Sequence, residues 1–166
     1  MEFTSLRFAT ACGASPRLRL DLAVNDFVSS AFLSKEIILN SKGNSWRPFI
    51  DVLDMCRAFH WALDKKDQSN TEKLIVNVGS NNLNYTIIDL AKNISSLIPN
   101  SLVKIKENAM IDQRSYRVNF DLYEKIAKGF LPTLEIEEIT KNLLNLFGEI
   151  NFNDENFRLS KLIEEK

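Results

Sequence analysis

The order of the segments predicts an α/β fold, in which mainly parallel strands are covered by helices. Apolar runs typical of strands alternate with segments whose apolar residues recur at the period of a helix. The run KLIVNVGS at 73–80 is continuous and ends at a glycine, which is typical of a strand buried on both faces of a parallel sheet. With 166 residues, the chain is long enough for one domain with its own hydrophobic core.

The first third predicts a strand, a helix and two short strands. Residues 5–13 alternate between apolar and polar side chains and lead into a loop with a glycine and a proline, which indicates a strand. Apolar residues of segment 20–33 recur every three or four positions, which indicates a helix. Segment 35–50 predicts two short strands around the turn at 41–44, whose residues tolerate positive φ.

Asp51 is expected to begin the next helix. Its carboxylate can cap the amides of the first turn. Asp54 lies in that turn, where a negative charge interacts favourably with the helix dipole. We therefore assign both aspartates to helix stabilisation rather than to acid–base chemistry. The apolar residues of this helix share one face: Val52, Met55, Phe59 and Leu63.

The second half predicts three more helices and two strands. A threonine and an aspartate three residues later form a capping-box-like start for a helix over 86–98. Short strands are predicted at 102–107 and 116–120, and segment 121–130 predicts a short helix that a glycine ends. A last helix, capped by Thr133, places four residues inward: Ile136, Ile139, Leu143 and Leu146.

Composition disfavours several classes of function. The 21 basic and 22 acidic residues nearly cancel, so we expect no nucleic-acid partner. No apolar stretch has the length of a membrane span, and the N-terminus does not have the pattern of a signal peptide. The two cysteines and the single histidine, His60, form no metal-ligand pattern. We therefore expect a cytoplasmic, metal-free protein.

Five stretches carry a more specific signal when they are taken together and in order. They are LRFATACGASPR (6–17), WRPFIDVLDMCRA (46–58), NVGSNNLNYTIIDLAKNI (77–94), DQRSYRVN (112–119) and KGFLPTLEIEEITKNLL (128–144). Together they resemble the C-terminal half of the extended short-chain dehydrogenase/reductase family, the NAD-dependent nucleotide-sugar epimerases and dehydratases.

Two elements that are typical of the family do not occur in this sequence. Family members begin with a glycine-rich G-x-x-G-x-x-G turn that holds the NAD pyrophosphate, and they carry a catalytic Tyr-x-x-x-Lys. The five glycines here lack that spacing, and none of the three tyrosines has a lysine four residues on. The resemblance thus implies that residues 1–150 are the C-terminal substrate-binding portion of an NAD(P)-binding Rossmann-like fold, followed by a polar tail at 151–166.

Two arginines are the leading candidates for binding substrate. The resemblance implies that Arg47 reaches the diphosphate of a nucleotide-sugar, because a guanidinium presents a fork of donors to phosphate oxygens. The alternative is a surface arginine whose stem packs against Trp46. Arg114 matches a second substrate arginine of the family, and its alternative is a pair with Asp112 on a solvated loop.

Four further residues are assigned to binding by the resemblance. It implies that Asn25 binds a phosphate oxygen, and the alternative is a polar residue on the exposed face of a helix. Thr10 would lie beside the sugar. Phe8 and Ala9 would pass the nicotinamide, and the alternative for these two is simply a core strand, which they would form in either case. Cys12 replaces the tyrosine usual in the family and has no evident basic partner, so no residue is assigned as catalytic.

The resemblance implies the nucleotide-sugar-binding half of an NAD-dependent sugar epimerase or dehydratase, inactive alone because the base and its lysine are missing. Two alternatives remain. One is a non-catalytic binding module, or a split-enzyme subunit completed by a separate Rossmann polypeptide. The other is a truncated gene fragment, whose bare strand edges would predict aggregation.

Overall fold

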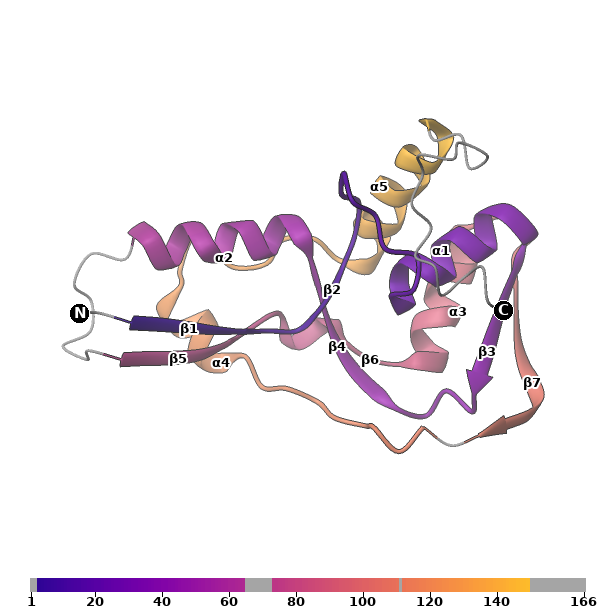
Figure 1. Cartoon of the computed structure of the whole chain (residues 1–166), viewed down its shortest axis with the longest axis horizontal. Helices are drawn as coiled ribbons and strands as arrows, with labels where there is room; N and C mark the ends of the chain where they lie inside the picture. The colour runs from indigo at the N-terminus through magenta and orange to yellow at the C-terminus, as the bar shows by residue number, and fades with distance from the viewer. Residues whose placement is uncertain (1–2, 65–72, 111, 150–166) are drawn as a thin grey trace.

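The computed structural model describes residues 3–64, 73–110 and 112–149, so the predicted tail at 151–166 lies outside the described residues. These ranges form the predicted α/β fold (Figure 1). The elements are β1 (Phe3–Phe8), β2 (Thr10–Cys12), α1 (Ala23–Ser34), β3 (Glu36–Ser41), β4 (Trp46–Asp51), α2 (Val52–Asp64), β5 (Lys73–Val78), the 3-10 helix η1 (Asn81–Leu83), β6 (Asn84–Thr86), α3 (Ile87–Leu97), β7 (Leu102–Met110), α4 (Asp121–Ile126) and α5 (Ile136–Glu149).

The described strands form three short sheets, and their pairing is mainly parallel. β1 pairs with β5, β2 with β4 and β3 with β7 in parallel, while β4 and β6 are antiparallel. The single strand predicted at 5–13 is divided at Ala9. The Ala9 N–H still donates to the carbonyl of Val78 at 2.9 Å, and the chain then leaves β5 and joins β4. Strands β3 and β4 flank the predicted turn but pair with different partners.

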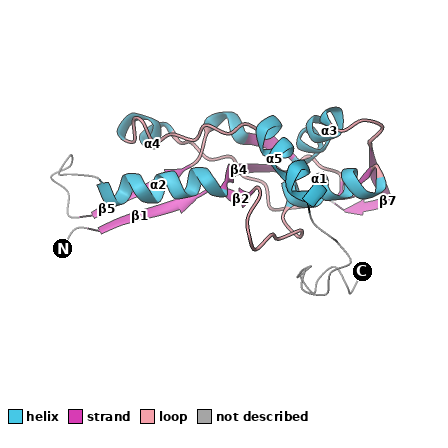
Figure 2. Ribbon diagram, turned by 90° about the horizontal axis from the view of Figure 1, so that it is seen from above, coloured by secondary structure: helices cyan, strands magenta, loops and turns pink. Residues whose placement is uncertain are grey.

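Two hydrophobic clusters form the core. One packs α1, α3 and α5 around β3 and includes Ile37, Ile94 and Leu143. The other lies between the β1–β5 sheet and helices α2 and α4, where Trp61 meets Tyr123 edge to face at 5.4 Å. Figure 2 shows α2 beside β1 and β5 at one end of the molecule, and α1, α3 and α5 toward the other. Burial of each large apolar side chain contributes about 1.5–3 kcal/mol.

The described residues cover the β1–β5 sheet on one face only, which corrects the prediction that the strand at 73–80 is buried on both faces. Val76 and Val78 are buried against the helices, whereas Ile75, on the opposite face, is exposed. A continuous apolar run shows that a strand has two apolar faces. It does not show that both faces are covered by the described residues.

Helix α2 also buries a side other than the one its apolar residues predict. The buried residues are Asp54, Ala58 and Trp61, whereas Phe59 is 52% exposed and Leu63 is 87% exposed. Periodicity identifies residues that share a face, but only the packing of neighbouring elements decides which face is covered.

The helix boundaries mostly follow the predicted signals. Thr86 caps α3, since its hydroxyl oxygen accepts the backbone N–H of Asp89 at 3.1 Å. Thr133 does not cap α5, which begins at Ile136. Its backbone N–H instead donates to Asp54, at 3.1 Å. The strand predicted at 116–120 is absent: this described segment makes one backbone bond to β4, from Tyr116 to Trp46, at 3.2 Å.

No helix of the described residues is long and apolar enough to cross a membrane.

Candidate functional site

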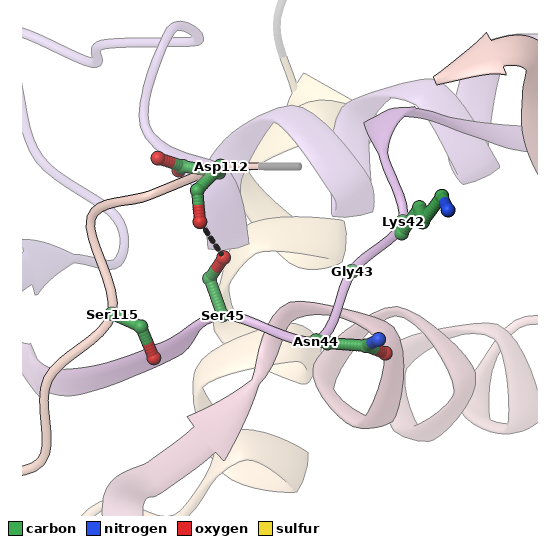
Figure 3. Close-up of a pocket in the computed structure, with 6 residues that line it drawn as sticks. All are labelled: Lys42, Gly43, Asn44, Ser45, Asp112 and Ser115. Carbon is green, nitrogen blue, oxygen red and sulfur yellow. Dashed lines mark hydrogen bonds between the residues drawn. The ribbon is translucent and has the colours of Figure 1, made fainter. Parts of the chain in front are cut away.

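The segment that leads from β7 toward α4 lies against the start of β4. We call residues 112–118 the crossing segment, which runs along β4 in Figure 1. The Ser45 hydroxyl donates to the carbonyl of Asp112 at 2.8 Å (Figure 3). The backbone N–H of Trp46 donates to the hydroxyl of Ser115 at 3.0 Å. These bonds hold the crossing segment against the strand that carries Arg47.

Arg47 is held in place by groups of this chain. Its Nη2 lies 2.9 Å from Oδ2 of Asp112, and its side chain is only 14% exposed. Nη1 donates to the carbonyl of Trp46 at 2.7 Å and also to that of Arg114. The guanidinium lies 5.2 Å from the ring centroid of Tyr116. The geometry thus gives Arg47 a role that neither sequence interpretation contains: it fastens the crossing segment to β4.

Arg114 meets the same carboxylate from the solvent side. Its Nε lies 3.1 Å from Oδ1 of Asp112, and its side chain is 84% exposed. The backbone N–H of Arg114 also donates to this oxygen, at 3.0 Å. The backbone N–H and then the side chain of Arg114, with a smaller contribution from Arg47, hold the pKa of Asp112 below its ordinary value. The fold therefore brings Arg47 and Arg114 together around one carboxylate, and the predicted Arg114–Asp112 pair is present.

The ring of Trp46 packs with another arginine. The guanidinium of Arg117 lies 4.4 Å from its centroid, a distance that favours a cation–π contact.

Asp112 lines two hollows. The first, of about 300 Å³, is lined by Lys42, Gly43, Asn44, Ser45, Asp112 and Ser115 (Figure 3). The second, of about 520 Å³, reaches from α1 and β3 to Asp112 and Arg114. In Figure 3 the Lys42 side chain points away from Asp112. Both volumes fall within the range of about 300–1,000 Å³ that is usual for small-molecule sites.

Asn25 is buried rather than on the exposed face of α1, so that alternative is wrong. Its Oδ1 accepts the backbone N–H of Gly13 at 2.9 Å, and its Nδ2 donates to the carbonyl of Arg19 at 3.0 Å. Both ends of the amide thus bind the loop between β2 and α1. A contact between this amide and a phosphate requires that loop to rearrange.

Thr10 lies on the strand next to Arg47. It stands opposite Phe49 in the parallel β2–β4 pair. Phe49 is two residues after Arg47 and on the same side of β4, so Thr10 is displaced from Arg47 by roughly 7 Å along the strand. That separation suits a ligand with a diphosphate at one end and a sugar at the other.

Phe8 and Ala9 lie where β1 ends. The ring of Phe8 packs against Phe59 of α2, with 5.2 Å between centroids. Ala9 is buried in the cluster between the sheet and the helices, and its N–H is used by β5. Both residues therefore belong to the core in this structure.

The acidic and thiol groups near the β2–α1 loop serve the fold. Oδ1 of Asp51 accepts the backbone N–H of Leu53 at 2.8 Å, which confirms the predicted helix cap. The thiol of Cys12 donates to the carbonyl of Ile50 at 3.3 Å. Burial, and then the nearby Asp51, raise the pKa of Cys12 far above its ordinary value, so it stays a neutral thiol. Its position does not suit a nucleophile.

One important contact was missed by sequence reasoning. Asp54, 1% exposed, accepts the backbone N–H groups of Thr133 and Leu134 at 3.1 Å and thereby connects α2 to the start of α5. In the sequence Asp54 is simply an aspartate in the first turn of a helix, where its charge interacts favourably with the helix dipole. That local role explained the residue, so nothing pointed to a contact with Thr133.

The sequence matches a known family over its first half. Residues 1–79 match the model of the NAD dependent epimerase/dehydratase family. These residues are just under half of the 166-residue chain, and they are similar to that family. The match includes Thr10, Asn25 and Arg47, whereas Asp112 and Arg114 lie beyond it.

Several solved structures have the same fold over most of this chain. MoeE5 in complex with UDP-glucose and NAD is 16% identical, with a TM-score of 0.69, over 89% of this chain and 48% of its own. The NAD-dependent NDP-hexosamine 5,6-dehydratase TunA, involved in tunicamycin biosynthesis, is 18% identical, with a TM-score of 0.71, over 90% of this chain and 46% of its own. The UDP-N-acetylglucosamine 4-epimerase from Bacillus cereus is 19% identical, with a TM-score of 0.70, over 87% of this chain and 48% of its own. The chain therefore has the Rossmann-like fold of these enzymes and spans about half their length.

NAD is the cofactor of the family, but the residues of this chain do not by themselves fit it. A dinucleotide needs a glycine-rich turn at a helix N-terminus for its pyrophosphate. Among the described residues, the loops that enter α1 and α3 hold no such turn. The Phe8 ring and the Ala9 N–H are occupied by contacts within the fold. No hydride-transfer step can be assigned to these residues.

Proposed function

We propose that this chain is the nucleotide-sugar-binding half of an NAD-dependent sugar epimerase or dehydratase and is catalytically inactive alone. The observation that carries the proposal is the convergence of Arg47 and Arg114 on Asp112, a residue that lines two hollows. Two arginines that face one point suit a diphosphate, because each guanidinium presents paired donors. Structures of the same fold that contain UDP-glucose or UDP-glucuronic acid support this class of ligand.

The proposal gives each residue a part in binding. Arg47 and Arg114 hold the diphosphate, and Thr10 contacts the sugar. Asn25 fixes the loop that borders the site and reaches a phosphate only when that loop moves. Phe8 and Ala9 form the wall on which the nicotinamide of a complete enzyme would lie.

Calorimetric titration of the purified chain with UDP-, GDP-, CDP- and dTDP-sugars, and separately with NAD, tests the proposal. We expect one nucleotide-sugar to bind and the affinity to fall at least tenfold in Arg47→Ala. The matched control is Arg7→Ala, which removes an exposed arginine from β1. Failure of every nucleotide-sugar to bind the folded chain would overturn the proposal. NAD-dependent turnover by the chain alone would contradict its inactivity.

The open edge of β1 favours a second candidate, a subunit completed by a separate Rossmann polypeptide. Among the described residues β1 pairs only with β5, and the neighbouring helix α2 exposes Leu53, Phe59 and Leu63. An unpaired edge next to an apolar helix face is a ready surface for association.

Sedimentation over a concentration series tests whether this surface drives association, which the candidate requires. We expect the chain to self-associate weakly through this surface when alone, and Phe59→Lys to reduce the association. Leu33→Lys, which changes an exposed apolar residue of α1, is the control. A chain that stays monomeric at every concentration and binds no hydrophobic dye would contradict an interaction surface here.

A further inference from the structure

The Asp112 carboxylate occupies the point at which Arg47 and Arg114 converge. One oxygen, Oδ2, lies 2.9 Å from Nη2 of Arg47 and 3.5 Å from Nη2 of Arg114. The other, Oδ1, lies 3.1 Å from Nε of Arg114. The carboxylate thus accepts from both guanidinium groups, as a phosphate placed between them would.

The backbone around this carboxylate is fixed more firmly than the carboxylate itself. The Asp112 carbonyl accepts the Ser45 hydroxyl at 2.8 Å, and Nη1 of Arg47 is bonded to the carbonyls of Trp46 and Arg114. The Asp112 side chain is 24% exposed and can rotate toward solvent without breaking these bonds. The Arg114–Asp112 pair is open to solvent, since the Arg114 side chain is 84% exposed, and such pairs are weak. An anion that pairs more strongly with both arginines can therefore replace the carboxylate.

We propose that Asp112 is an internal competing anion, which the diphosphate of the ligand displaces from Arg47 and Arg114 when it binds. The inference rests on the proposed nucleotide-sugar function. A diphosphate carries more negative charge than a carboxylate and can bridge both guanidinium groups at once. A monophosphate or a single carboxylate gains less from the same exchange. The carboxylate therefore lowers the affinity of the site for every anion that must displace it, and only an anion that binds both arginines strongly is retained.

Titration of wild-type chain and Asp112→Asn with UDP, UMP and inorganic pyrophosphate tests the role of the carboxylate. Asparagine keeps the size of the side chain and removes its charge. We expect Asp112→Asn to bind UDP and pyrophosphate roughly tenfold tighter than wild type, since like charges near a bound anion repel. UMP must displace the same carboxylate, so we expect its affinity to rise by a similar factor. Glu36→Gln, which removes one charge from the exposed Glu36–Lys104 pair, is the control and should bind as wild type does.

The outcomes separate this inference from the function on which it rests. If wild type binds UDP and Asp112→Asn binds it equally or more weakly, then Asp112 orients the arginines and the inference is wrong. If neither folded protein binds any of the probes, the nucleotide-sugar proposal falls and the inference falls with it.

A second measurement uses the wild-type chain alone and does not depend on the folding of a variant. The backbone N–H of Arg114 donates to Oδ1 of Asp112. Displacement of the carboxylate breaks that bond, so saturating pyrophosphate should shift the Arg114 amide resonance upfield and speed its hydrogen exchange. An Arg114 amide that stays unchanged while pyrophosphate binds would overturn displacement.

Discussion

Asp54 connects helix α2 to the segment that enters α5, and replacing it by alanine should cost about 3 kcal/mol of the free energy of unfolding. Its buried carboxylate accepts the N–H groups of Thr133 and Leu134, each at 3.1 Å. A hydrogen bond to a charged group contributes about 1.5 kcal/mol at the lower end of its range, which gives about 3 kcal/mol for two. The hydroxyl of Thr133, at 3.4 Å from Asp54, is too distant to add much.

Urea unfolding followed by circular dichroism measures this loss. With a slope of about 2 kcal/mol per molar urea, the midpoint should fall by roughly 1.5 M in Asp54→Ala. Asp54→Asn keeps one acceptor oxygen and should lose about half as much. Thr133→Ala should change little, because the backbone N–H remains.

Asp64→Ala is the matched control, since Asp64 lies on the same helix and is exposed. Surface substitutions of this kind usually stay within about 0.5 kcal/mol. A loss below about 1 kcal/mol in Asp54→Ala, at an unchanged slope, would refute the reasoning: the two N–H groups would then find water or another acceptor.

Three further predictions concern Cys12, Asp51 and Gly13, which lie in or next to the start of the loop between β2 and α1. The exposed Cys56 should react with a thiol reagent in the folded chain, whereas the buried Cys12 should react only after denaturation, because burial raises the pKa of Cys12. Reaction of both cysteines in the folded chain would contradict this. Burial also raises the pKa of Asp51 above 3.8, so its proton is held more tightly in the folded state. The stability of wild type relative to Asp51→Asn should therefore fall as pH rises from about 3.8 toward neutrality, and a pH-independent difference in urea titrations would refute it. Gly13→Ala should cost several kcal/mol, since a Cβ would lie 1.9 Å from Oδ2 of Asp51 and φ is +100°. Gly129→Ala, at φ +87° with nothing within 4 Å, should cost about 1 kcal/mol, and equal losses in the two variants would disprove the clash.

The candidate site was predicted only in part. Arg47 and Arg114 were identified because their surrounding stretches resemble those of a family. Their meeting at one carboxylate depends on the crossing segment, which no local pattern predicted. Asn25 illustrates the opposite case. Its helix was correctly predicted, but its burial against Gly13 and Arg19 follows from the path of the loop before that helix.

The sequence by itself determined the local features of this protein. The presence of the helices, the Thr86 cap of α3 and the Asp51 cap of α2 depend on residues within a few positions of one another, and these predictions were confirmed. Only the tertiary structure decided which strands pair, which side of α2 is buried, and that Arg47 binds a carboxylate 65 residues away. The physical reason is that such contacts join segments whose approach depends on the packing of the whole chain, which no short window of sequence contains.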